Sequence, residues 1–357
     1  MAEKKTSGGR LVYLDLLRIM SVVMMVTLHI SGVGMRADIG SFDWHVCNIY
    51  DGITHICVPV FIMISGAFLL DPEREYSIKK LYKVKILRIA TAFVFWSAFY
   101  AIIRASRSTL PFGKKFVLEF LTDFLKGEFH LWFMFMIAGL YMITPILRKI
   151  TQDKKLTEYF LILSCVFMFG LSNVALYSLH GRIDEVFLYI DEKFNMDFVF
   201  GYTFYYVAGY YFKRYSPGKK FKALLYIGGL VSAVMIPLGT YYYSAKLGEN
   251  LFILYAFQSP FIGLLSVSAF VLFKDLFSGR EFGKGSLKVI SFLSKYSFGV
   301  YLVHAAIIDY LSYEFDVDCF SFNTVFSVPL LGIGVFAVSL LIIYLVGKIP
   351  VLNKYIM

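Results

Sequence analysis

Residues 11–34 read LVYLDLLRIMSVVMMVTLHISGVG, a run of 24 mostly apolar residues. A helix of about 20 such residues crosses the hydrocarbon core of a bilayer. The preceding MAEKKTSGGR is basic like the start of a signal peptide, but the apolar run is too long for one and lacks a small-residue cleavage site. We therefore expect residues 11–34 to remain as the first membrane helix.

The rest of the chain has the same character. Its 357 residues are 58% hydrophobic and 17% charged, with a mean hydropathy of +0.67, whereas soluble domains carry about 25% charged residues. This composition excludes a cytosolic globular enzyme. We expect an all-α polytopic membrane protein that is one domain over residues 1–357, with no appended soluble domain and about ten transmembrane helices, at 11–34, 46–70, 86–105, 130–149, 158–179, 197–213, 223–243, 251–273, 289–312 and 322–347.

The charges indicate an orientation. With residues 1–10 as a cytoplasmic tail, the inner connections hold 25 Lys and Arg residues and the outer ones hold 9. This asymmetry places both termini in the cytoplasm under the positive-inside rule. The net charge of +10 is then explained by contact with the lipid bilayer or an anionic substrate, and no nucleic acid partner is expected. The outer connection 106–129 alternates apolar and polar residues like a helix on the membrane surface.

The four cysteines have no CxxC or Cys/His spacing. They predict neither a zinc site nor a disulfide framework, and we expect no metal. A bridge between Cys47 and Cys319 outside the membrane is left open.

The first helix contains three ionisable residues, Asp15, Arg18 and His29. Such groups are costly at membrane depth unless they are paired or face water, so they indicate a functional site. Arg18 and His29 are eleven residues apart, which leaves them about 20° from alignment on one helix face and about 16 Å apart along the axis. Asp15 is within reach of Arg18. The alternative is that Asp15 and Arg18 only neutralise each other and that His29 only caps a helix.

Other polar residues are expected at a similar depth to His29. Asp51 and His55 share one face of the second helix, and Tyr301 and His304 lie in the ninth. We therefore expect His29, His55 and His304 to converge, with carboxylates near enough to set a tautomer. No two of these histidines share a helix at ligand spacing, which argues against a metal.

The connection 73–88 reads EREYSIKKLYKVKILR and is strongly basic. Lys80, Lys83 and Arg88 fall roughly on one helical face, and Lys85 lies between them. Basic runs of this kind usually indicate only the orientation of the chain in the membrane. This number of closely spaced cations also suits binding of the phosphates of a nucleotide-like donor, and Arg88 is the best placed of them.

Aromatic residues mark the expected outer ends of two helices. His130 and Trp132, in GEFHLWFMF, either line an entrance for an acceptor or anchor a helix. The strip 198–212, FVFGYTFYYVAGYYF, is attributed to packing and to the interfacial belt rather than to a sugar platform.

Several motifs together resemble the acyltransferase-3 family of bacterial integral membrane proteins. The first helix has that family's pattern of an Arg, ten residues and a His, through Arg18 and His29. Four further segments resemble later family motifs, in the same order: VPVFIMISGAFLL at 58–70, LYKVKILRI at 81–89, HLWFMFMIAGLYMITPIL at 130–147 and YSFGVYLVHAAI at 296–307. Lys85 departs from the family, since many members have Arg there. The chain looks like the stand-alone members, similar to the O-acetyltransferase of enterobacterial common antigen.

The resemblance implies an O-acyltransferase of the bacterial inner membrane. The donor would be acetyl-coenzyme A or another acyl-coenzyme A, and the acceptor a hydroxyl of a cell-surface glycan or its lipid-linked precursor. His29 would be the general base or form an acyl-histidine, and Arg18, held by Asp15, would bind the donor. His304 and Tyr301 would polarise the thioester or the acceptor.

Two further questions stay open. Some relatives with similar membrane regions have been regarded as exporters of glycans or amino acids, and in such a carrier the buried charges would line a permeation path. A homo-oligomer is also left open, because no GxxxG interface stands out.

Overall fold

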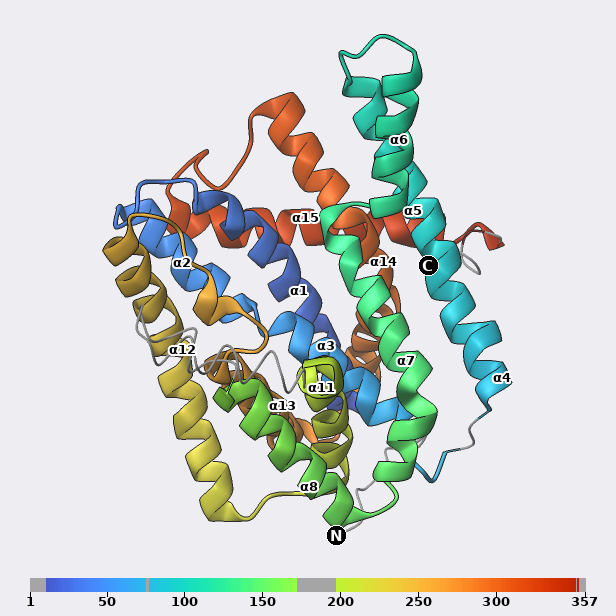
Figure 1. Cartoon of the computed structure of the whole chain (residues 1–357), viewed down its shortest axis with the longest axis vertical. Coiled ribbons are helices and arrows are strands. Elements are labelled where there is room, and N and C mark those ends of the chain that lie inside the picture. The colour runs from blue at the N-terminus through green and yellow to red at the C-terminus, as the bar shows by residue number, and fades with distance from the viewer. Residues whose placement is uncertain (1–10, 75–76, 172–196, 351, 353–357) are drawn as a thin grey trace.

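A computed structural model of the chain describes residues 11–74, 77–171, 197–350 and 352. Regular structure in these ranges is helical and contains no strand, so the predicted all-α class is confirmed there (Figure 1). The helices are, in chain order, α1 (Val12–Gly34), α2 (Phe42–Thr54), α3 (Cys57–Leu69), α4 (Ile78–Lys80), η1 (Leu81–Ile86), α5 (Leu87–Arg107), α6 (Lys114–Lys126), η2 (Phe129–Leu131), α7 (Trp132–Ile150), α8 (Lys154–Ser164), η3 (Cys165–Leu171), α11 (Asp197–Arg214), α12 (Lys219–Leu247), η4 (Ile253–Tyr255), α13 (Pro260–Phe277), α14 (Lys284–Phe315) and α15 (Thr324–Val346).

Eight helical segments of the described chain are long and apolar enough to cross a membrane: Val12–Gly34, Phe42–Leu69, Ile78–Arg107, Phe129–Ile150, Lys219–Leu247, Ile253–Phe277, Lys284–Phe315 and Thr324–Val346. The predicted count of ten is therefore not confirmed. One of the two remaining predicted spans, 158–179, ends outside the described residues. The other, 197–213, corresponds to α11, whose Tyr205, Tyr206 and Val207 are completely buried. A helix enclosed by protein needs no continuous lipid-facing surface, so tyrosines replace aliphatic residues in it.

Helix α1 lies in the middle of the molecule (Figure 1). It packs against α2, α3, α13, α14 and α15. Its ionisable residues therefore face other helices, and the Asp15 side chain is buried. This placement satisfies the requirement that charges at membrane depth be enclosed by protein or face a water-filled space.

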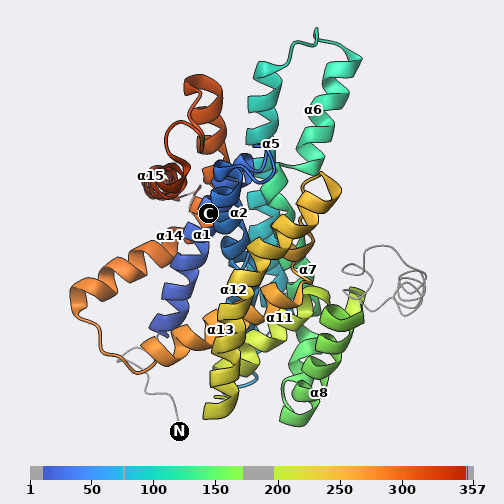
Figure 2. The same cartoon turned by 90° about the vertical axis from the view of Figure 1, so that its left-hand side faces the viewer.

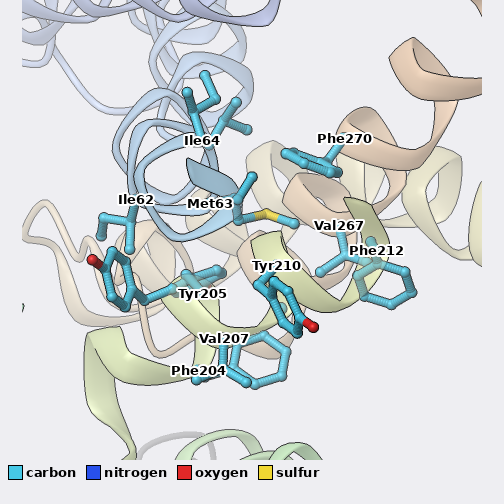
Figure 3. Close-up of a cluster of buried hydrophobic side chains, with 14 of the residues drawn as sticks. Ile62, Met63, Ile64, Phe204, Tyr205, Val207, Tyr210, Phe212, Val267 and Phe270 are labelled. Carbon is cyan, nitrogen blue, oxygen red and sulfur yellow. The ribbon is translucent and has the colours of Figure 1, made fainter. Parts of the chain in front are cut away.

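Helices α3 and α11 cross in close contact because each has a glycine at the crossing. A Cβ added to Gly66 would lie 1.8 Å from the carbonyl oxygen of Tyr206, and one added to Gly209 would lie 1.9 Å from that of Met63. Small residues allow such close approach of two backbones. Figure 3 shows apolar side chains of α3, α11 and α13, Met63 among them, gathered around this region.

Gly66→Ala is expected to destabilise the protein strongly. The new methyl group would meet backbone atoms, which no rotamer change relieves, so we expect a loss of about 3 kcal/mol, the upper end of the usual cost of overpacking. Thermal unfolding of the detergent-solubilised protein measures the loss as a lower Tm. The matched control is Gly139→Ala in α7, where no heavy atom lies within 4 Å of the added Cβ. Equal Tm values for the two variants would contradict the packing argument.

The connection predicted as a surface helix forms α6, but α6 runs back along α5. Arg104 of α5 forms ion pairs with Asp123 of α6 at 3.2 Å and with Glu128, which follows α6, at 2.8 Å. The α5–α6 hairpin projects beyond the neighbouring helices in Figures 1 and 2. The chain then enters η2 and α7, which carry His130 and Trp132.

Candidate active site

A cavity of about 760 Å³ opens between α1, α3, α5, α7 and α14. Both Arg18 and His29 line it, so it extends along α1 for the about 16 Å that separates them. The predicted alignment of these two residues is therefore found in the structure as a shared cavity wall.

Four cations line one part of the cavity: Arg18 of α1, Lys85 of η1, Arg88 of α5 and Lys295 of α14. Lys85 lies within electrostatic range of both Arg18 and Arg88. No acidic side chain of the described chain lines the same cavity. Four cations and no acidic side chain on the described wall make this part of the cavity suited to an anion.

Asp15 and Ser294 both contact the Arg18 guanidinium, Ser294 from the cavity wall. The Ser294 hydroxyl donates to Asp15 Oδ1 at 2.6 Å, and Arg18 Nη1 lies 3.0 Å from Ser294 Oγ and 3.4 Å from Asp15 Oδ1. Asp15 does not line the cavity. It therefore orients Arg18 and is not placed to touch a molecule in the cavity. Ser294 and Lys295 were not singled out in the sequence, where Lys295 counted only as an inner charge.

The structure changes the predicted register of the basic stretch. The segment η1 is a π-helix, in which the backbone N–H of Leu87 reaches the carbonyl of Tyr82 five residues back. This wider turn breaks the regular helical spacing from which Lys80, Lys83 and Arg88 were placed on one face. Lys80 and Lys83 are exposed and do not line the cavity, whereas Lys85 and Arg88 do.

Three histidines meet beyond the cationic part. The His29 ring stacks on His304, with 5.2 Å between the ring centroids and 22° between the ring planes. The His130 ring lies 5.0 Å from His304, edge to face. The His130 side chain is 2% exposed. His130 thus belongs to the histidine cluster as well as to the cavity wall.

Hydrogen bonds determine the roles of His304 and Tyr301. His304 Nδ1 lies 2.8 Å from the carbonyl oxygen of Tyr301, so Nδ1 carries the proton and Nε2 is the acceptor nitrogen of the neutral ring. The Tyr301 hydroxyl donates to the carbonyl of His130 at 2.8 Å. His304 is fully buried and not on the cavity wall. Tyr301, in contrast, lines the cavity, and each of the two residues packs against a neighbouring histidine.

His55 lies on the cavity wall and within electrostatic range of His29. Its Nδ1 is 2.8 Å from the carbonyl oxygen of Asp51 and 3.5 Å from Asp51 Oδ1. The proton is therefore on Nδ1, and Nε2 is free to accept. Asp51 is buried behind His55 and does not line the cavity.

Aromatic side chains complete this end of the cavity. Trp132 stacks on Phe257, with 5.7 Å between ring centroids, and Tyr202 lies 6.0 Å from Trp132. All three line the cavity. Trp132 was expected either to line an acceptor entrance or to anchor a helix. Phe257 carries no sequence signal, because it lies in a short connection after η4, and Tyr202 belongs to the strip that was attributed to packing.

The described residues contain no group of three or more His, Cys, Asp or Glu side chains arranged to hold a metal ion. A family model described as an acyltransferase domain, that of the acyltransferase-3 family, matches residues 11–346. No curated protein and no solved structure matches the chain.

Proposed function

Because the chain belongs to the acyltransferase-3 family and is a membrane acyltransferase, we propose that it moves an acetyl or other short acyl group from acyl-coenzyme A to a glycan hydroxyl. The acceptor is a cell-surface glycan or its lipid-linked precursor. The proposed setting is the bacterial inner membrane, with the donor entering from the cytoplasm. The distribution of Lys and Arg between the connections supports this orientation.

One observation carries the proposal. A single cavity has cations at one end and histidines with aromatic rings at the other. Coenzyme A has the matching polarity, since its phosphates and its thioester are at opposite ends of a flexible pantetheine arm. Arg18, Lys85, Arg88 and Lys295 would hold the phosphates and the polar part of the arm. The arm would then pass Phe61, Phe133 and Ile137, and the thioester would reach His29.

Acyl transfer needs a base, because a sugar hydroxyl is too weakly acidic to attack at neutral pH. In the proposed step His29 takes the hydroxyl proton while the oxygen attacks the thioester carbonyl carbon. The C–O bond forms, the C–S bond breaks, and the coenzyme A thiolate leaves with the proton from His29. Stacking on His304 keeps the His29 ring in place.

An acyl-histidine intermediate is the alternative route. It would leave labelled acyl group on the protein when acyl-coenzyme A is supplied without acceptor, and direct transfer would leave none.

The first test measures free thiol released from acetyl-coenzyme A by purified protein, with and without a cell-envelope glycan extract. Release that depends on the extract supports transfer to a glycan, and the acetylated product identifies the acceptor. A carrier would release no thiol. Absence of thiol release with every extract, despite measurable donor binding, would overturn the proposed reaction.

Trp132→Ala is expected to weaken use of the acceptor without affecting the donor. Loss of one aromatic contact, worth about 0.5–1.5 kcal/mol, should raise the acceptor KM about 2- to 10-fold. The KM for acyl-coenzyme A should not change, because the cations are at the other end of the cavity. Phe135→Ala is the matched control, since Phe135 is on the same helix but exposed outside the cavity. A larger change in donor KM than in acceptor KM would contradict the assignment.

A further inference from the structure

Cys47 of α2 and Cys319 of the connection between α14 and α15 lie side by side. They are 0% and 1% exposed, and both are free thiols in the structure. A Cβ built on Gly34 would be 2.0 Å from Cys47 Sγ and 3.3 Å from Cys319 Sγ. The two sulfur atoms are therefore no further apart than the sum of these distances. The absence of a side chain at Gly34 leaves the space that the thiols occupy.

Hydrogen bonds hold the two elements together on both sides of this pair. Thr324 Oγ1 donates to Asp43 Oδ1, and the Tyr50 hydroxyl donates to the carbonyl of Val325 at 3.0 Å. Asp43, Cys47 and Tyr50 have the i, i+4, i+7 spacing of a single helix face. That face of α2 meets the start of α15, so the approach of the two cysteines follows from the packing of their elements and not from one side-chain rotamer.

We propose that Cys47 and Cys319 form a disulfide bond in the membrane-inserted protein. The positive-inside rule assigns both residues to the outer side of the membrane, where disulfides form and persist. The oxidant is a protein disulfide of a thiol oxidase. One cysteine thiolate attacks that disulfide and releases one thiol, and the second cysteine then displaces the other. Two protein thiols are oxidised and one disulfide is reduced to two thiols. The exchange takes place during insertion, before the pair is buried.

The bond would connect α2 to the segment between α14 and α15. Helix α2 carries Asp51, and His55 follows at its end, while α14 carries Tyr301 and His304. The bond would therefore fix the outer rim of the candidate site. It is independent of the proposed reaction, because it depends only on the thiol pair and the orientation of the chain.

The test counts free thiols in the full chain. Membranes from a bacterium with an oxidising periplasm are quenched in acid, and the denatured protein is labelled with a polyethylene-glycol maleimide before and after reduction. The chain has four cysteines. We expect two adducts without reductant, on Cys57 and Cys165, and four after reduction. Mass spectrometry of the unreduced protein should find the peptides of Cys47 and Cys319 joined.

Single variants make the assignment specific. Cys47→Ser and Cys319→Ser should each show three adducts with or without reductant. Cys165→Ser is the matched control and should change from one adduct to three on reduction. Four adducts on unreduced wild-type protein would overturn the proposal, as would a reduction-dependent shift that persists in Cys47→Ser.

Discussion

His29→Ala is expected to lower kcat for acyl transfer by about 10²- to 10⁴-fold, the usual contribution of a general base. His29 lines the cavity, and its ring stacks on that of His304. The KM for acyl-coenzyme A should remain close to that of the wild type, because Arg18, which belongs to the cationic part of the cavity, is about 16 Å away from His29 along α1. Single-turnover release of free thiol in the presence of acceptor measures the effect.

His45→Ala is the matched control for this experiment. His45 is also an aromatic-packed histidine, 4.6 Å from the ring of Tyr241, but it does not line the cavity. Its replacement should leave kcat unchanged. A folded His29→Ala protein with full activity would refute the role of His29 and leave the cavity without an identified base.

Arg88→Ala is expected to raise the KM for acyl-coenzyme A about 10- to 100-fold. A hydrogen bond to a charged group is worth about 1.5–3 kcal/mol, and each 1.4 kcal/mol corresponds to a factor of about ten. The effect should disappear with an acyl-pantetheine donor, which retains the thioester but lacks phosphates. Thiol release over a range of donor concentrations gives both values.

Lys79→Ala is the control for loss of positive charge in the same stretch. Lys79 is exposed and outside the cavity, so its replacement should change the donor KM little. An equal effect of Lys79→Ala and Arg88→Ala would show that the stretch acts only through its overall charge. An Arg88→Ala defect that persists with acyl-pantetheine would place Arg88 away from the phosphates.

The first helix shows what can be predicted from residues that are close together in the sequence. The length of the apolar run predicted α1, and the geometry of a regular helix predicted that Arg18 and His29 share a face. Both properties depend only on residues within the run. The pairing of Asp15 with Arg18 was predicted for the same reason, and the structure shows it at 3.4 Å.

The basic stretch shows where the same reasoning fails. Its register was predicted from regular α-helical spacing, but η1 is a π-helix. In the structure Lys85 and Arg88 line the cavity while Lys80 and Lys83 do not. A change in helical hydrogen bonding depends on packing against neighbouring helices, and nothing in LYKVKI distinguishes it from an ordinary helix.

The sequence by itself determined that this is a helical membrane protein and that Arg18 and His29 share one helix face, because apolar run length and helical period are local. The convergence of His29 with His304 was also expected from the sequence, but only the tertiary structure decided that His130 joins them and that Phe257 and Lys295 line the same cavity. Those contacts depend on how closely helices cross, as at Gly66 and Gly209, and on where connections pack. Such arrangements join residues that are far apart in the chain, so no local pattern encodes them.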